Sequence, residues 1–274
     1  MLWGRAKNDP RPGTWAKVTG ADARKKNFSA LSLTCGRELV DFPIMPRHAR
    51  SARGGVIYHV LNRATPGTRL FSKPGDYQAF EAVLDEAYRR VPIRILAYCV
   101  MPNHWHLVLW PKTGRQLSEF MRWLTVTHTQ RWHWQHRTAG TGHLYQSRYR
   151  SFPVQPGEPL LTVCRYVESN PLRAKLVKRA QDWRWSSLYR RRSGTAQQQE
   201  ILADLRRPAN WLALVSKPLP EPVLTAARTS VQRSRPFGTD KWMKDTVKSM
   251  HLEWTVRPRG RPRKTPLPPP KKRK

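Results

Sequence analysis

The stretch that decides the fold is Met101-Pro102-Asn103-His104-Trp105-His106-Leu107-Val108-Leu109-Trp110. Its residues alternate with period 2, which predicts a β-strand with His104 and His106 on one face. Trp105 and Leu107 then point to the other face. Two imidazoles about 6 to 7 Å apart along a strand can each offer a nitrogen to one divalent metal. The alternative is a pair of half-buried strand histidines with ordinary hydrogen bonds, so another stretch must supply the rest of a site.

The segments around this strand predict an alternation of strands and helices. Residues 56–63 and 93–100 are rich in β-formers, and Pro102-Asn103 is a tight turn that makes a hairpin with the histidine strand. Apolar residues at helical spacing predict helices over about 76–90, from 117 through 134, and from Pro159 toward Asn170-Pro171. The order strand, helix, strand, strand, helix, strand, helix predicts an α+β sandwich with a mainly antiparallel sheet, in a ferredoxin-like or RRM-like arrangement.

Residues 143–152 supply the last strand of that order. The pattern predicts a basic face that contains Arg148 and Arg150, with Tyr145 and Tyr149 on the opposite face.

The charge of the chain indicates its partner. Lys and Arg number 51 against 18 Asp and Glu, which gives a net charge of +33 and favours nucleic acid. A membrane surface is the alternative for a basic chain, but there is no apolar run of about 18 residues and no strongly amphipathic basic helix. The three cysteines have no metal-type spacing and favour neither a disulfide framework nor a zinc knuckle. We therefore expect a protein of the reducing cytoplasm, associated with the nucleoid and not with a membrane.

The domain organisation follows from shifts in composition. Residues 1–44 lack periodicity and are predicted to be a disordered extension, whether translated or the product of a wrongly chosen start codon. No apolar core of a signal peptide follows the start. Residues 45–192 are predicted to form the main domain, 193–254 a helical C-terminal region, and 255–274 a disordered basic, Pro-rich tail.

The tail contains Pro258-Arg259-Gly260-Arg261-Pro262, which resembles an AT-hook. Arg259, Arg261 and Arg263 could enter a narrow A·T minor groove, where Gly260 permits close approach. The alternative is a generic polycationic tail. In both cases the tail should raise DNA affinity in a salt-dependent manner.

Tyr166 and Asn170 are the residues that could complete a site with the histidines. Their i, i+4 spacing places them on one face of a helix. A Tyr hydroxyl can act as a nucleophile, and an Asn carbonyl oxygen can bind a hard metal. With His104 and His106 they would make a phosphodiester-cleaving site in which the metal stabilises charge on the phosphate and the Tyr oxygen attacks phosphorus. The alternatives are a core aromatic for Tyr166 and a helix terminator for Asn170.

Other residues compete for these roles. Tyr145 and Tyr149 lie near the predicted basic strand face, but neither has an amide ligand one helical turn away, and packing against the sheet is their expected role. His133 and His136 could bind a second metal, yet surface histidines beside Trp132 and Trp134 are the preferred interpretation.

Three stretches of the chain together resemble a known family. They are Met101-Pro102-Asn103-His104-Trp105-His106, Gly142-His143-Leu144-Tyr145-Gln146-Ser147-Arg148-Tyr149, and Arg165-Tyr166-Val167-Glu168-Ser169-Asn170-Pro171-Leu172-Arg173-Ala174. The chain resembles, over about residues 45–190, the REP-associated tyrosine transposases, which are single-tyrosine members of the HUH superfamily of DNA-nicking enzymes. Trp105 stands where that family has a bulky apolar residue.

The resemblance implies an RRM-like fold and a definite set of roles. His104 and His106 would bind Mg²⁺ or Mn²⁺, Asn170 would be the third ligand, and Tyr166 would form a 5′-phosphotyrosine, leaving a free 3′-OH on the other product. The substrate it implies is single-stranded DNA folded into hairpins of repeated extragenic palindromes.

Arg148, Arg150 and Arg165 flank the predicted site and could hold phosphates. The alternative functions are a catalytically inactive DNA-binding protein with the same sheet and tail, and an RRM-like RNA binder. Both a monomer and a homodimer are compatible with the sequence.

Overall fold

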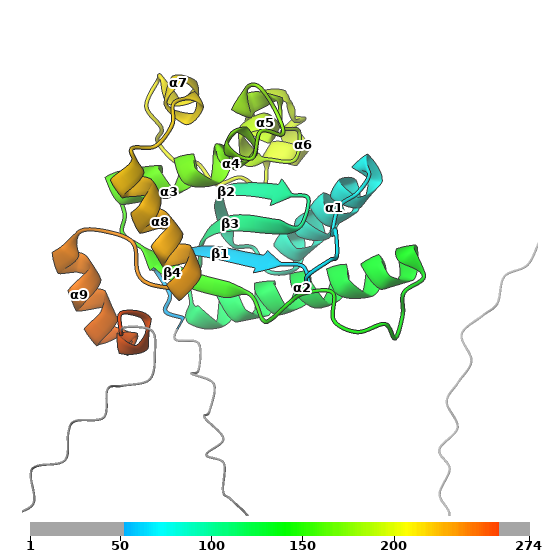
Figure 1. Cartoon of the computed structure of the whole chain (residues 1–274), viewed down its shortest axis with the longest axis horizontal. Coiled ribbons are helices and arrows are strands. Elements are labelled where there is room, and N and C mark those ends of the chain that lie inside the picture. The colour runs from blue at the N-terminus through cyan, green and yellow to red at the C-terminus, as the bar shows by residue number, and fades with distance from the viewer. Residues whose placement is uncertain (1–51, 258–274) are drawn as a thin grey trace, which may run out of the picture. The chain divides into compact units, whose positions relative to one another are not determined.

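The computed structural model describes residues 52–257 and contains one four-stranded antiparallel sheet in that range. Its strands, in the order β2-β3-β1-β4, are β1 (Ile57–Arg63), β2 (Arg94–Met101), β3 (His104–Trp110) and β4 (Arg150–Val154) (Figure 1). Helix α1 (Pro74–Arg90) connects β1 to β2, and α2 (Gly114–His136) connects β3 to β4. This βαββαβ order is ferredoxin-like, so the predicted α+β fold class is confirmed.

The strand register decides which side chains share a face. Leu61 of β1 pairs with His106 of β3, and Arg63 pairs with His104. Because paired residues point to the same side of a sheet, alternate residues of β1 join the two histidines on one face. On the other edge of β1, Leu61 pairs with Arg150 of β4, which adds Arg150 to that face.

Each face of the sheet has its own apolar core. Trp105 and Leu107 pack with α1 and α2 on one face, as the alternation in the sequence predicts. The histidine face is covered by α3 (Glu158–Glu168) and α8 (Glu221–Arg233) (Figure 1). Helix α3 is amphipathic, and Leu160, Val163 and Val167 turn toward the sheet.

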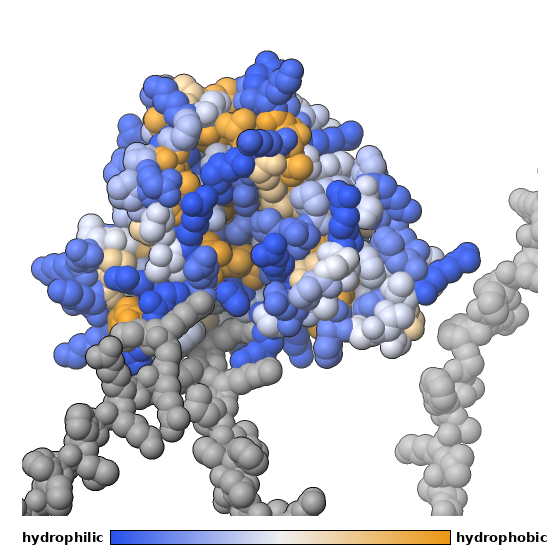
Figure 2. Space-filling view, in the orientation of Figure 1, coloured by the Kyte–Doolittle hydropathy of each residue, from blue (hydrophilic) through white to orange (hydrophobic). Residues whose placement is uncertain are grey.

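Between α3 and residue 257, all named elements are helices or 3-10 turns. The remaining helices are α4 (Asn170–Arg173), α5 (Ser187–Ser193), α6 (Ala196–Gln199), α7 (Trp211–Ser216) and α9 (Asp240–Ser249), with single 3-10 turns at Ala180–Asp182 and Glu253–Thr255. Trp211 and Val215 of α7 belong to the core under α3, whereas Val247 of α9 belongs to the core of α1 and α2. The C-terminal helices therefore extend the two cores of the sheet. In the space-filling view, hydrophilic residues dominate the visible surface (Figure 2).

The predicted strand over 143–152 is wrong in extent. Only Arg150–Val154 forms β4, and residues 143–149 form a loop whose backbone bonds go to the end of β1. Thr65 N donates to Leu144 O at 3.0 Å, and Gln146 N donates to Arg63 O at 3.0 Å. The predicted alternating face therefore does not exist for Arg148, which lies in the loop.

Several predictions concern residues that the structure does not describe. Residues 1–44 and the tail arginines Arg259, Arg261 and Arg263 lie outside the described residues. Between residues 52 and 257, no helix combines the length and the apolar character needed to cross a bilayer.

Candidate functional site

The two histidines of β3 lie next to each other on the α3 face of the sheet. Their ring centres are 5.0 Å apart. His106 is 2% exposed, and its Nδ1 lies 2.9 Å from Nε2 of His59 on β1, which is also buried. His104 is partly buried, and its Nδ1 lies 2.7 Å from Oδ1 of Asn103. Each ring therefore has its Nδ1 held by a neighbour.

These imidazoles are neutral at pH 7. Burial, with the charges of Arg63 and Arg173, lowers the pKa of His104 from 6.5 to about 4. Burial lowers the pKa of His59 to about 3, and burial with the neighbouring His59 and His104 lowers that of His106 well below its usual value. A neutral imidazole is the form that binds a metal.

The hydrogen bonds also select the free nitrogen. Because the Asn103 carboxamide oxygen can only accept, His104 donates from Nδ1 and keeps the lone pair on Nε2. Between His59 and His106 one nitrogen donates and the other accepts. When His106 is the donor, its lone pair is likewise on Nε2, so the pair can offer two Nε2 atoms to one cation.

Tyr166 lies over His106 and His59. Its ring centre is 6.1 Å from that of His106 and 6.3 Å from that of His59, and the residue is 8% exposed. The apolar face of α3 directs Tyr166 toward the strands of its own chain. The residues that the sequence singled out, far apart along the chain, therefore meet within one chain.

Asn170 and Arg173 complete the cluster. Helix α3 ends at Glu168 and α4 begins at Asn170, with Ser169 between them. Asn170 Oδ1 accepts from Arg173 Nη2 at 3.1 Å, while its Nδ2 is buried without a hydrogen-bond partner among residues 52–257. The Arg173 guanidinium lies 4.1 Å from the centre of the Tyr166 ring and donates to Tyr166 O at 2.7 Å and to Ser169 Oγ at 2.7 Å.

His59 and Arg173 were not predicted as site residues. Arg173 could have been found from the sequence, because it lies seven residues after Tyr166 and thus on the same helical face. His59 is a histidine within an apolar strand, but its link to His106 depends on the pairing of β1 with β3.

The predicted DNA-binding arginines occupy different places. Arg150 is exposed on the histidine face, where its Nη1 lies 3.2 Å from Gln232 O. Arg148 is exposed in the preceding loop. Arg165 donates to Lys217 O and Pro218 O at 2.8 and 3.0 Å, so its guanidinium is turned toward the segment after α7. Arg63, opposite His104, is a further cation that the sequence analysis missed, besides Arg173.

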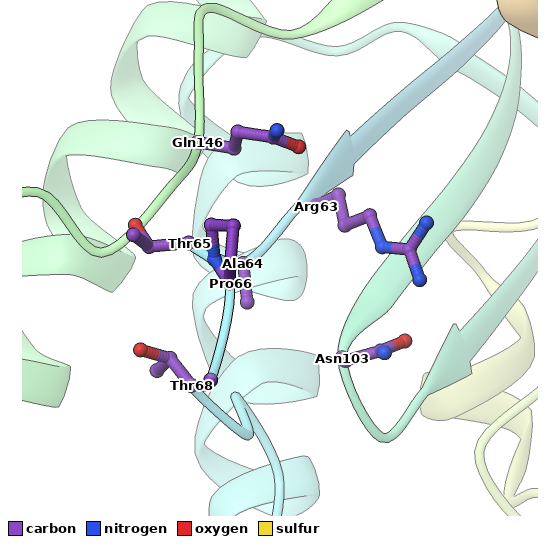
Figure 3. A pocket seen from close by; sticks show the side chains of 8 residues that line it. Arg63, Ala64, Thr65, Pro66, Thr68, Asn103 and Gln146 are labelled. Carbon is purple, nitrogen blue, oxygen red and sulfur yellow. The ribbon is translucent and has the colours of Figure 1, made fainter.

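A pocket of about 330 Å³ opens beside the histidines. Arg63 and Asn103 line it and lie on the same side of the 64–68 loop, with Gln146 across from them (Figure 3). The pocket and the site thus share two residues. Asn103 bonds His104, and Arg63 lies opposite His104.

The competing residues are engaged elsewhere. Tyr145 accepts from Trp105 Nε1 at 3.0 Å and bonds His128 Nδ1 at 2.7 Å on the opposite face of the sheet, where Tyr149 also packs. His136 stacks on Trp132 at 4.1 Å, and His133 bonds Thr138. In the described part of the chain, no three His, Cys, Asp or Glu residues are grouped to hold a metal.

A comparison with known protein families agrees with the motifs. Residues 53–170 match the family model described as "Transposase IS200 like", a range that includes all four strands, both histidines of β3, Tyr166 and Asn170. This match confirms the predicted resemblance to transposases over that range. Among solved structures, "Structure of the REP associates tyrosine transposase bound to a REP hairpin" is similar, with 19% identity, a TM-score of 0.42, and coverage of 60% of this chain and 96% of that chain. No curated protein matches the chain significantly.

Proposed function

We propose that this chain, similar to IS200-like transposases over residues 53–170, is a metal-dependent transposase that cleaves and rejoins single-stranded DNA. The observation that carries the proposal is the Tyr166 ring, whose centre lies 6.1 Å from that of the buried, neutral His106 of the same chain. The hairpin substrate and the 5′-phosphotyrosine rest on the motif resemblance in the sequence.

The residues present fit a divalent cation. His104 and His106 can each present Nε2, and Asn170, four residues after Tyr166 at the start of α4, is the third candidate ligand. Its carboxamide oxygen keeps a second lone pair beyond the one that accepts from Arg173. Two imidazoles and an amide oxygen suit Mg²⁺ or Mn²⁺ when water and phosphate oxygens fill the other positions. The bound cation would neutralise charge on the scissile phosphate.

Tyr166 is the proposed nucleophile. Its oxygen forms a bond to phosphorus, the bond from phosphorus to the 3′-oxygen breaks, the phenolic proton passes to water, and the departing oxygen takes a proton to become a 3′-OH. Attack by a 3′-OH on the phosphotyrosine reverses these steps and rejoins DNA. The Arg173 guanidinium supplies positive charge above the Tyr166 ring, next to the phosphate as it gains charge.

The DNA would approach over a strongly basic surface. The net charge of +33 supports a polyanionic substrate, and Arg63 and Arg150 supply cations on the face that carries the histidines. We also propose Arg148 as a phosphate contact and the arginines of the tail as contacts to an A·T-rich duplex. Arg165 could join them only by leaving the carbonyls of Lys217 and Pro218.

The test is covalent capture. Labelled single-stranded hairpin DNA is incubated with Mn²⁺ and the native chain, Tyr166→Phe or Tyr189→Phe, and is run on a denaturing gel. The native chain and the Tyr189→Phe control should form a protein–DNA adduct, whereas Tyr166→Phe should bind the hairpin without forming one. A native chain that binds hairpins but never forms an adduct would instead support the catalytically inactive DNA-binding protein, and preference for RNA would support the RRM-like RNA binder.

A further inference from the structure

The nucleophile helix carries a buried charge that the proposed reaction does not use. Glu168 lies two residues after Tyr166 at the end of α3 and is 0% exposed. A buried carboxylate is costly unless each oxygen has a partner. Glu168 therefore requires a partner for each of its carboxylate oxygens.

Its partners come from distant parts of the chain. Ser187 Oγ, at the start of α5, donates to Oε1 at 2.6 Å, and Trp211 Nε1, at the start of α7, donates to Oε2 at 2.7 Å. Arg207 Nη2 lies 3.6 Å from Oε1 and also donates to Leu96 O of β2 at 2.7 Å. Both carboxylate oxygens are thus satisfied, and two of the partners link the cluster to β2, because Ser187 Oγ also accepts from Tyr98 N at 3.0 Å.

A second anchor lies one turn earlier on α3. Arg165 donates to the backbone oxygens of Lys217 and Pro218, directly after α7. Residues 207–218 therefore hold α3 at two points, Arg165 and Glu168, on either side of Tyr166. This segment lies outside residues 53–170, which match the transposase family model.

We infer that residues 207–218 form a clamp that fixes the nucleophile helix over the histidines of its own chain, with Glu168 as the positioning residue. The inference rests on the proposed function for its catalytic consequence. Tyr166 can attack only from a defined distance and direction, and a displacement of about 1 Å can cost about 100-fold in rate. A carboxylate bonded on both oxygens resists rotation and translation of the helix end that carries it.

Two variants separate positioning from folding. Glu168→Gln keeps the size of the side chain. Its carboxamide has one accepting oxygen, so its NH2 group must face the donor of either Trp211 or Ser187. Trp211→Phe removes the Nε1–H donor and retains most of the ring packing. Trp134→Phe, at an 83% exposed position on α2, is the matched control.

The readouts are the single-turnover rate of adduct formation at saturating hairpin DNA, the hairpin Kd, and hydrogen exchange of the metal-free, DNA-free chain. For Glu168→Gln and Trp211→Phe the rate should fall about 10- to 100-fold while Kd stays unchanged. Exchange should accelerate in α3 and α4 and remain as in the native chain in β1 and β3. Trp134→Phe should match the native chain throughout.

An unchanged adduct rate in both clamp variants would overturn the inference. So would a loss of protection that spreads over the whole sheet, because that result describes a general loss of stability. If the native chain forms no adduct with any DNA, the proposed function fails, and hydrogen exchange alone then decides on the clamp. Selective acceleration in α3 and α4 supports it, and unchanged exchange there overturns it.

Discussion

Replacing His59 by leucine should weaken metal binding without removing a metal ligand. In the native chain His59 Nε2 lies 2.9 Å from His106 Nδ1, and this contact fixes the orientation of the His106 ring, whose Nε2 is the proposed metal ligand. The leucine side chain would leave the buried Nδ1 of His106 without a partner. Partners of this kind typically change metal affinity about 10- to 100-fold, or about 1.4 to 2.7 kcal/mol.

His128→Leu is the matched control. His128 is 3% exposed against 1% for His59, burial lowers the pKa of each to about 3, and each ring makes one hydrogen bond, which is buried for His59 and partly buried for His128. Both substitutions should therefore lower the free energy of unfolding by a similar amount, about 1 to 3 kcal/mol. His128, however, lies on the opposite face of the sheet.

The assay is a calorimetric titration of Mn²⁺ into each metal-free chain. His59→Leu should raise the Kd for Mn²⁺ about 10- to 100-fold, and His128→Leu should leave it unchanged. Equal Kd values for the native chain and His59→Leu would refute the orienting role of His59. If both substitutions weakened Mn²⁺ binding equally, the cause would be the lower stability of the fold and not the orientation of His106.

Three further outcomes follow from the same geometry. Arg173→Lys should slow adduct formation about 100-fold in single-turnover assays with hairpin affinity unchanged, because an ammonium cannot reproduce the planar guanidinium above the Tyr166 ring; an unchanged rate would exclude Arg173 from the reaction. A mixture of Tyr166→Phe and His106→Ala chains should form no adduct, because one chain supplies both residues, whereas recovered activity would mean that chains exchange α3. The depressed pKa values of His59, His104 and His128 mean that the unfolded chain binds more protons below about pH 6.5. The free energy of unfolding of the metal-free chain, measured by denaturant titration, should therefore be constant above that pH. Below it, this free energy should fall by about 1.4 kcal/mol per pH unit for each histidine. A free energy that stays constant down to about pH 5 would contradict the burial of neutral rings.

The sequence predicts the histidine strand and its hairpin well because period 2 and a Pro-Asn turn are local signals. The same holds for α1, α2 and α3, whose apolar spacing predicts the face that packs on the sheet. The meeting of Tyr166 with the histidines was predicted from residue chemistry and from the family resemblance. It depends on α3 crossing the strands, which no local pattern determines.

Apart from Arg173, which lies seven residues after Tyr166, the missed site residues depend on long-range pairing. His59 faces His106 only because β1 pairs with β3, and Glu168 meets Trp211 only once α7 folds back on α3. The sequence of residues 143–149 alternates like that of a strand. Most of its backbone N–H and C=O groups, however, do not pair with a neighbouring strand. Its two backbone bonds to the end of β1 form one isolated antiparallel bridge, between Ala64 and Tyr145, and the ladder does not continue from there.

The most direct measurement of the central claim is mass spectrometry of the DNA-linked peptide after proteolysis of the adduct. The account predicts that the nucleotide is attached through phosphate to Tyr166, in the peptide that also carries Glu168 and Asn170. Attachment to another residue, such as Tyr149, would contradict the proposed site.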